Sequence, residues 1–125
     1  MPTNHKYNLL IATDDEVIAP ILQSELINYN YSVVIKRSFK ELIDEAQNQK
    51  YDLVILTSLG LIATEIPDCV TQLKIIDPNS KIMVMSNYGS DDFDTFLAEN
   101  NITAIHKFPI DIELLHSDIH SLLKT

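Results

Sequence analysis

The sequence has few glycines, a single cysteine, no tryptophan and few basic residues. Gly60 and Gly89 are its two glycines, so the glycine-rich loops that hold phosphate in dinucleotide-binding folds and P-loop enzymes are excluded. Cys69 is alone and can build neither an internal disulfide nor a cysteine zinc cluster. This cysteine usage favours a reducing, cytoplasmic location.

Positive charge is scarce as well. Nine Lys and Arg stand against eighteen Asp and Glu, which gives a net charge of −9 at pH 7. Such a surface repels the phosphates of nucleic acid and anionic membranes, so we expect neither as a partner. The apolar run Leu9–Ala12 near the N-terminus is too short for a signal-peptide core or a membrane span, so we expect no export or anchoring by these signals.

The remaining composition is that of one packed domain. The chain has 125 residues, of which 46% are hydrophobic, and this size fits one core and not two. No repeat, linker or low-complexity segment divides the chain. We therefore expect a single domain over residues 1–125, with residues 1–6 as a short tail.

Five short apolar runs without apolar/polar alternation predict strands that are covered on both faces, as in parallel sheets. They are Asn8–Thr13, Ser32–Ile35, Leu53–Thr57, Ile82–Ser86 and Thr103–Lys107.

Segments with helical periodicity separate these runs. They cover Ile18–Tyr29, a helix capped by Ser38, about Pro67–Ile76, a helix capped by Ser90, and about Asp111–Leu123. Strict alternation of strand and helix predicts an α/β fold, a (βα)5 doubly wound parallel sheet with the flavodoxin-like strand order 2-1-3-4-5. In this order, functional groups gather at the carboxyl ends of the strands.

The residues at those strand ends are Asp14 and Asp15 after the first strand, Thr57 at the third, Ser86 at the fourth and Lys107 at the fifth. Two acids after strand 1, a hydroxyl after strand 4 and a lysine after strand 5 make the chain resemble the receiver domain of bacterial two-component response regulators. The segments Leu10–Glu16 and Tyr51–Leu56 are similar to the first and third strands of that family, and the resemblance covers essentially the whole chain.

The resemblance implies roles for these residues. In the family, the acid pair (here Asp14 and Asp15) holds Mg²⁺, an aspartate at the end of strand 3 accepts the phosphoryl group, and the hydroxyl and lysine contact the phosphate. Thr57 stands where that aspartate is expected. A threonine hydroxyl is a weak nucleophile without a positioned base, and Mg²⁺ prefers carboxylate oxygens. We therefore expect phosphotransfer to fail and Mg²⁺ binding to be weak or lost.

Three further features follow from comparison with the family. With one acid gone, we expect Lys107 to form a static ion-pair cluster with Asp14 and Asp15. Ala104 stands where the family has a switching aromatic residue. The family follows its lysine directly with proline, usually through a cis bond, whereas this chain reads Lys107-Phe108-Pro109, so this turn must be rebuilt by one residue.

These features predict a phosphorylation-independent pseudo-receiver, a protein-interaction module in signalling and not an enzyme. The resemblance implies docking on a protein, a kinase or an output protein, and homodimerisation through helix 4, strand 5 and helix 5, about Tyr88–Leu97 and Ala104–Leu123. Tyr88, Phe108 and His106 are the candidate contact residues.

Two other functions stay open at this point. One is an active phosphate-binding protein in which Thr57, Ser86 and Lys107 cradle a phosphate while Asp14 and Asp15 hold a metal. The other is a flavin or nucleotide module, which the acidic loop after strand 1 disfavours because it would repel the ligand's phosphate.

Simpler interpretations exist for each candidate residue. Acid pairs such as Asp14 and Asp15 are typical of helix N-termini. A threonine such as Thr57 is common in strands, and a serine such as Ser86 is common in turns. His116 and His120 have metal-ligand spacing, but no third ligand accompanies them, so we expect them to face solvent. Cys69 lies within a helix, which favours a structural role.

Overall fold

The computed structural model describes residues 6–58, 61–102 and 104–124, so most of the expected tail lies outside the described residues. The strands are β1 (Asn8–Ala12), β2 (Ser32–Lys36), β3 (Leu53–Thr57), β4 (Ile82–Met85) and β5 (Ile105–His106). The helices are α1 (Ile18–Asn28), α2 (Phe39–Asn48), α3 (Ile66–Ile76), α4 (Asp91–Glu99) and α5 (Ile112–Leu123), with a short 3-10 turn, η1 (Ala63–Glu65), before α3.

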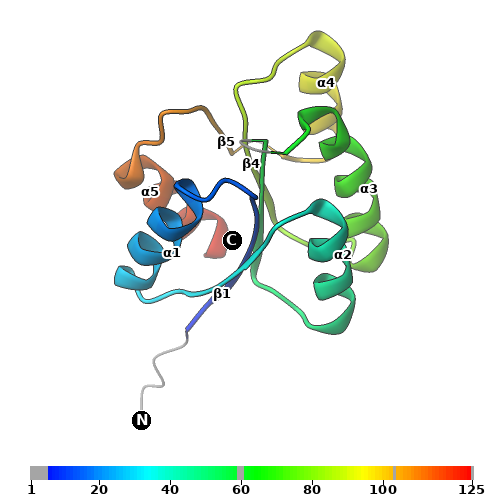
Figure 1. Ribbon diagram of the computed structural model, residues 1–125. Coiled ribbons are helices and arrows are strands. Elements are labelled where there is room, and N and C mark those ends of the chain that lie inside the picture. Colours follow the sequence, from blue (N-terminus) through cyan, green and yellow to red (C-terminus); the bar gives the residue numbers. More distant parts are fainter. Residues whose placement is uncertain (1–5, 59–60, 103, 125) are drawn as a thin grey trace.

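The strands form one parallel sheet in the order β2-β1-β3-β4-β5, which confirms the predicted fold class. Figure 1 shows α1 and α5 on one face of the sheet and α2, α3 and α4 on the other. Successive strand residues point to opposite faces, so Leu9 and Ile11 pack toward α1 and α5, while Leu10 and Ala12 pack toward the other three helices. The uninterrupted apolar runs therefore supply a hydrophobic cluster on each face of the sheet within one domain.

The helix starts follow the local rules of capping. Ser38 Oγ accepts a hydrogen bond from the Glu41 N–H at 3.0 Å, and Ser90 Oγ accepts one from the Phe93 N–H at 3.1 Å. Each bond satisfies an N–H that has no partner within its helix. Both predicted caps are confirmed, and α3 ends at Ile76, as the Asp77-Pro78 pair predicts.

The fifth strand and the end of the first helix differ most from expectation. The fifth strand is reduced to Ile105–His106; it is an edge strand that pairs with β4 alone, and Thr103 lies outside the described residues. Tyr29, expected on the inner face of the first helix, follows the last residue of α1 and is 37% exposed. Among the described residues, every helix is too short or too polar to traverse a lipid bilayer.

Candidate functional site

The predicted site residues lie where the strands of the sheet end. Asp14 and Asp15 follow β1, Thr57 is the last residue of β3, and Ser86 follows β4. Because β1, β3 and β4 are parallel neighbours, their carboxyl ends share one edge of the sheet. The fold thus brings this set of side chains to one edge, as the sequence predicts.

The carboxylate of Asp15 is hydrogen-bonded to the N-terminus of the helix that follows it. Its Oδ1 accepts hydrogen bonds from the N–H groups of Val17 at 2.9 Å and Ile18 at 2.8 Å. A carboxylate at this place satisfies unpaired N–H groups and complements the positive end of the helix dipole. The simpler interpretation of the acid pair, as helix N-terminal stabilisation, therefore holds for Asp15, whereas Asp14 is exposed.

Thr57 is fully buried, with 0% of its surface exposed. Its Oγ1 is shielded from solvent and has no hydrogen-bond partner among the described residues. Leaving a buried hydroxyl unpaired costs about 1–3 kcal/mol. Among the described residues, no hydrogen-bonded base is therefore in place to activate this neutral hydroxyl at the end of β3.

Ser86 is also buried, and its hydroxyl has two partners. Its Oγ accepts a hydrogen bond from Ser58 Oγ at 2.8 Å and another from the Tyr88 N–H at 3.0 Å. The second bond closes a local turn between β4 and α4, in line with the simpler interpretation of Ser86 as a turn residue. The Ser58–Ser86 contact joins the ends of β3 and β4.

The expected ion-pair cluster around Lys107 does not form. No ion pair in the described part of the chain joins Lys107 to Asp14 or Asp15, and Lys107 is exposed. Water screens charges at the surface, and an exposed ion pair gains too little energy to hold a long side chain in one place. Asp15 is moreover already held by the N-terminus of α1.

The turn after β5 is rebuilt around Phe108 and Asn87. The Phe108 N–H donates to Asn87 Oδ1 at 2.7 Å, the Asn87 amide donates to the Phe108 carbonyl at 3.3 Å, and the Phe108-Pro109 peptide bond is cis. The Phe108 ring packs partly buried against the core on the α1/α5 face. Phe108 is thus partly a core residue, and the role of Asn87 was not predicted.

His106 lies beneath the surface, contrary to its expected role as a contact residue. Its side chain is 5% exposed, and its Nε2 is 2.7 Å from Asp118 Oδ2 on α5. This contact is an ion pair when the imidazole is protonated, although it does not have the geometry of a hydrogen bond. The side chain points inward because alternate residues of a strand face opposite sides, and Ile105 takes the outward position.

His116 also differs from expectation, because it is half-buried and not directed into solvent. Its ring stacks on Tyr29, with 3.6 Å between the ring centroids, and lies 6.1 Å from the His120 ring. Burial, and then the neighbouring His120, hold the pKa of His116 below its usual value. This stack joins the end of α1 to α5.

The donor set at the carboxyl edge does not fit a tight Mg²⁺ site. Mg²⁺ requires near-octahedral oxygen ligation with carboxylates prominent, but Asp15 is held by α1 and Thr57 is neutral. Within residues 6–58, 61–102 and 104–124, no three His, Cys, Asp or Glu side chains come together closely enough to ligate a metal ion. Asp14 is the carboxylate that remains uncommitted there.

Comparisons with known proteins agree with this fold. No protein-family model matches the chain. The chain is 25% identical over 92 residues to the transcriptional regulatory protein ZraR of Escherichia coli (strain K12), a match that covers 70% of this chain and 20% of ZraR. The chain therefore spans about a fifth of that relative.

Solved receiver structures superpose over nearly the whole chain. A CheY-like response regulator receiver domain protein from Methanospirillum hungatei JF-1 gives a TM-score of 0.87 at 20% identity and covers 96% of this chain and 95% of its own. Vibrio cholerae CheY4 has a TM-score of 0.82 at 16% identity, and the match covers 94% of this chain and 99% of CheY4. The beryllofluoride-activated NtrC4 receiver domain dimer has a TM-score of 0.83 at 16% identity, and the match covers 94% of this chain and 96% of that chain. The chain therefore has the fold of response-regulator receiver domains.

Proposed function

We propose that this chain is a receiver domain that works without phosphorylation, as a protein-interaction module in signal transduction. The observation that carries the proposal is Thr57, a buried hydroxyl at the end of β3 where the resemblance places a phosphoacceptor aspartate. No partner among the described residues is positioned to take the Thr57 proton, so attack on a phosphohistidine is not assisted. A binding role, without enzymatic activity, follows.

The neighbouring residues support the same proposal. Asp15 is used as a helix cap, Ser86 is used in a turn, and Lys107 is exposed and apart from the acids. Each group that the family uses for phosphate or metal thus has a structural role or faces solvent. We infer that the domain does not switch by phosphorylation and that it works in the cytoplasm, where its single cysteine stays reduced.

The face formed by α4, β5 and α5 is our candidate docking surface for a kinase, an output protein or a second copy of this chain. Tyr88 is 42% exposed and its ring meets Phe93 edge-on at 5.0 Å, while Ile105 is 41% exposed on the edge strand. A fixed aromatic side chain beside an exposed aliphatic one is typical of interface anchors. NtrC4, whose receiver domain forms a dimer in its beryllofluoride-activated state, shares this fold.

The test is a Mg²⁺ titration with and without beryllofluoride, observed through the backbone amide resonances near Asp15, Thr57 and Ser86. We expect no saturable shift, and we expect Thr57→Val to behave as the wild type does because neither side chain is a carboxylate. Tight, Mg²⁺-dependent binding of beryllofluoride to the wild type would refute the proposal.

A phosphate-binding role is the second candidate, because the Ser58 and Ser86 hydroxyls meet at 2.8 Å next to Thr57. Labelling with a small phosphodonor separates the two functions. If no label is incorporated, the result supports the interaction module. A base-stable label would identify a phosphorylated hydroxyl, and a base-labile label would identify an acyl phosphate.

A further inference from the structure

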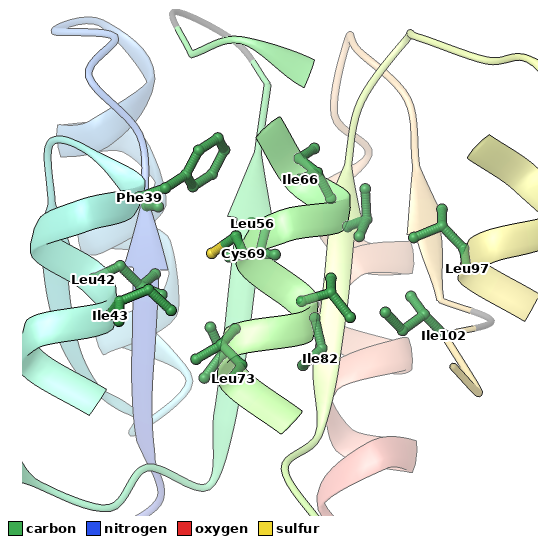
Figure 2. Close-up of a cluster of buried hydrophobic side chains, with 14 of the residues drawn as sticks. Phe39, Leu42, Ile43, Leu56, Ile66, Cys69, Leu73, Ile82, Leu97 and Ile102 are labelled. Carbon is green, nitrogen blue, oxygen red and sulfur yellow. The ribbon is translucent and has the colours of Figure 1, made fainter. Parts of the chain in front are cut away.

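A groove made of two neighbouring hollows lies between α2 and α3, on the opposite face of the sheet from α1 and α5 (Figure 1). It consists of two hollows, an upper one of about 370 Å³ beside η1 and a lower one of about 360 Å³ at the C-terminal ends of α2 and α3. Gln47 lines both hollows and lies where they meet. Figure 2 shows Ile43 of α2 and Cys69 of α3 in the space between the two helices, over the sheet.

The upper hollow has an apolar floor and acidic walls. Phe39, Ile43 and Cys69 form the floor. Three carboxylates, those of Asp44, Glu65 and Asp68, and one lysine, Lys40, line the walls. In the described part of the chain, none of these three acids takes part in an ion pair, although Asp68 Oδ2 accepts a hydrogen bond from the Gln72 side chain at 2.8 Å.

The negative potential of these walls reaches the floor. The pKa of the Cys69 thiol is raised to about 12, first by burial and then by the carboxylates of Asp68 and Glu65. Burial disfavours a charge of either sign at this floor, whereas the part of the shift that comes from Asp68 and Glu65 reflects their negative charge, which attracts cations to the exposed walls.

The lower hollow adds a second acidic position. Asp77 meets Lys50 at 3.9 Å, but the Lys50 side chain is 86% exposed, and a pair this exposed is weak and easily exchanged. The C-terminal ends of α2 and α3 line the same hollow, and their dipoles favour cations. Ser80 lines it too, and its shielded Oγ has no partner among the described residues.

We propose that the α2–α3 groove binds a basic, amphipathic segment of a partner protein, whose apolar side chains pack on the floor and whose Lys or Arg side chains meet the acidic walls. Charge complementarity selects this occupant: four carboxylates line the two hollows against Lys40 and Lys50, and the domain carries a net charge of −9. The groove lies apart from the α4–β5–α5 face, and the inference does not depend on the state of Thr57.

A peptide titration tests this assignment. The probe is an acetylated, amidated peptide of leucine and arginine with helical spacing, and its counterpart carries glutamate in place of arginine. We expect the arginine peptide to cause saturable amide shifts at Ile43, Gln47 and Cys69, and the glutamate peptide to cause none. Shifts confined to the α4–β5–α5 face, or spread evenly over the acidic surface, would overturn the proposal.

Charge variants separate specific docking from general attraction. The pair Asp44→Asn with Asp68→Asn should weaken binding of the arginine peptide about tenfold. The matched pair Asp91→Asn with Asp92→Asn removes the same charge from the first turn of α4 and should leave the affinity within about twofold. Equal weakening by both pairs would mean that net charge alone attracts the peptide, which contradicts a defined site.

A steric variant gives an independent readout that does not change the charge. Gln47 is exposed at the junction of the hollows, so Gln47→Trp should obstruct the groove and reduce the affinity about tenfold. Gln23→Trp places the same side chain on an exposed position of α1 and serves as the control. Full affinity in a folded Gln47→Trp variant, with folding verified by its unfolding transition, would refute the groove as the binding site.

Discussion

Replacing Thr57 by valine should stabilise the protein. Thr57 is 0% exposed and its Oγ1 has no partner among the described residues, and an unpaired buried hydroxyl costs about 1–3 kcal/mol. Valine has nearly the same shape and puts a methyl group in place of the hydroxyl. Small movements let a hydroxyl recover part of its hydrogen bonding, so the low end of this range applies. We therefore expect the free energy of unfolding to rise by about 1 kcal/mol.

Urea unfolding at equilibrium measures this change directly. The midpoint should move to higher urea at an unchanged m-value, and the thermal midpoint should rise by roughly 4 °C. Thr13→Val is a matched control with the opposite expected sign. Thr13 is 1% exposed, but its Oγ1 accepts a hydrogen bond from the Asp15 N–H at 3.2 Å, so the same substitution should cost about 1 kcal/mol.

A loss of stability in Thr57→Val of about 1 kcal/mol or more would refute this reasoning. It would mean that the hydroxyl is held by an ordered water or an anion at the carboxyl edge of the sheet. That outcome would favour the phosphate-binding alternative over the pseudo-receiver.

Three other predictions concern association, reactivity and pH. Tyr88→Ala should weaken self-association about tenfold in sedimentation equilibrium, whereas Ile75→Ala, which trims an apolar side chain of α3 that is 76% exposed, should not; equal effects would exclude the α4–β5–α5 face. Because burial and nearby carboxylates raise the pKa of Cys69 to about 12, its thiol should react with iodoacetamide at least roughly a thousandfold more slowly in the folded than in the unfolded protein; similar rates would contradict its burial. The pKa of His116 is lowered from 6.5, so folding favours its neutral form, and this contribution to stability is complete above pH 6.5 and is lost as the pH falls below it. His116→Phe keeps a ring against Tyr29 and should flatten the acid side of the stability profile measured by urea unfolding; an unchanged profile would assign the pH dependence to other groups.

Much of the fold could be predicted because its signals are local. The caps at Ser38 and Ser90 depend on hydrogen bonds within one helical turn. The end of α3 depends on Pro78, the next residue but one. The strand order followed from the alternation of buried runs with amphipathic helices, which leaves few ways to wind the chain.

The side chains around β5 could not be predicted in the same way, because their positions depend on residues distant in the sequence. His106 meets Asp118 on α5, and Phe108 is held by Asn87 after β4. Lys107 is charged and directly follows the two-residue edge strand β5, but neither property fixes the direction of its side chain. The apolar packing of Phe108 outweighs the small gain of an exposed ion pair.

Position 57 lies among residues that have structural roles at this edge of the sheet. Asp15 stabilises α1, Ser86 closes the turn before α4, and Phe108 fills the core next to α5. In these roles the three residues contribute to stability whether or not a phosphoryl group is ever present. A carboxylate at position 57 would enter a fully buried place, where the charged form is disfavoured unless a cation pairs with it. This burial favours a neutral side chain at position 57, in line with our proposal that a partner is recognised by the outer surfaces of the domain.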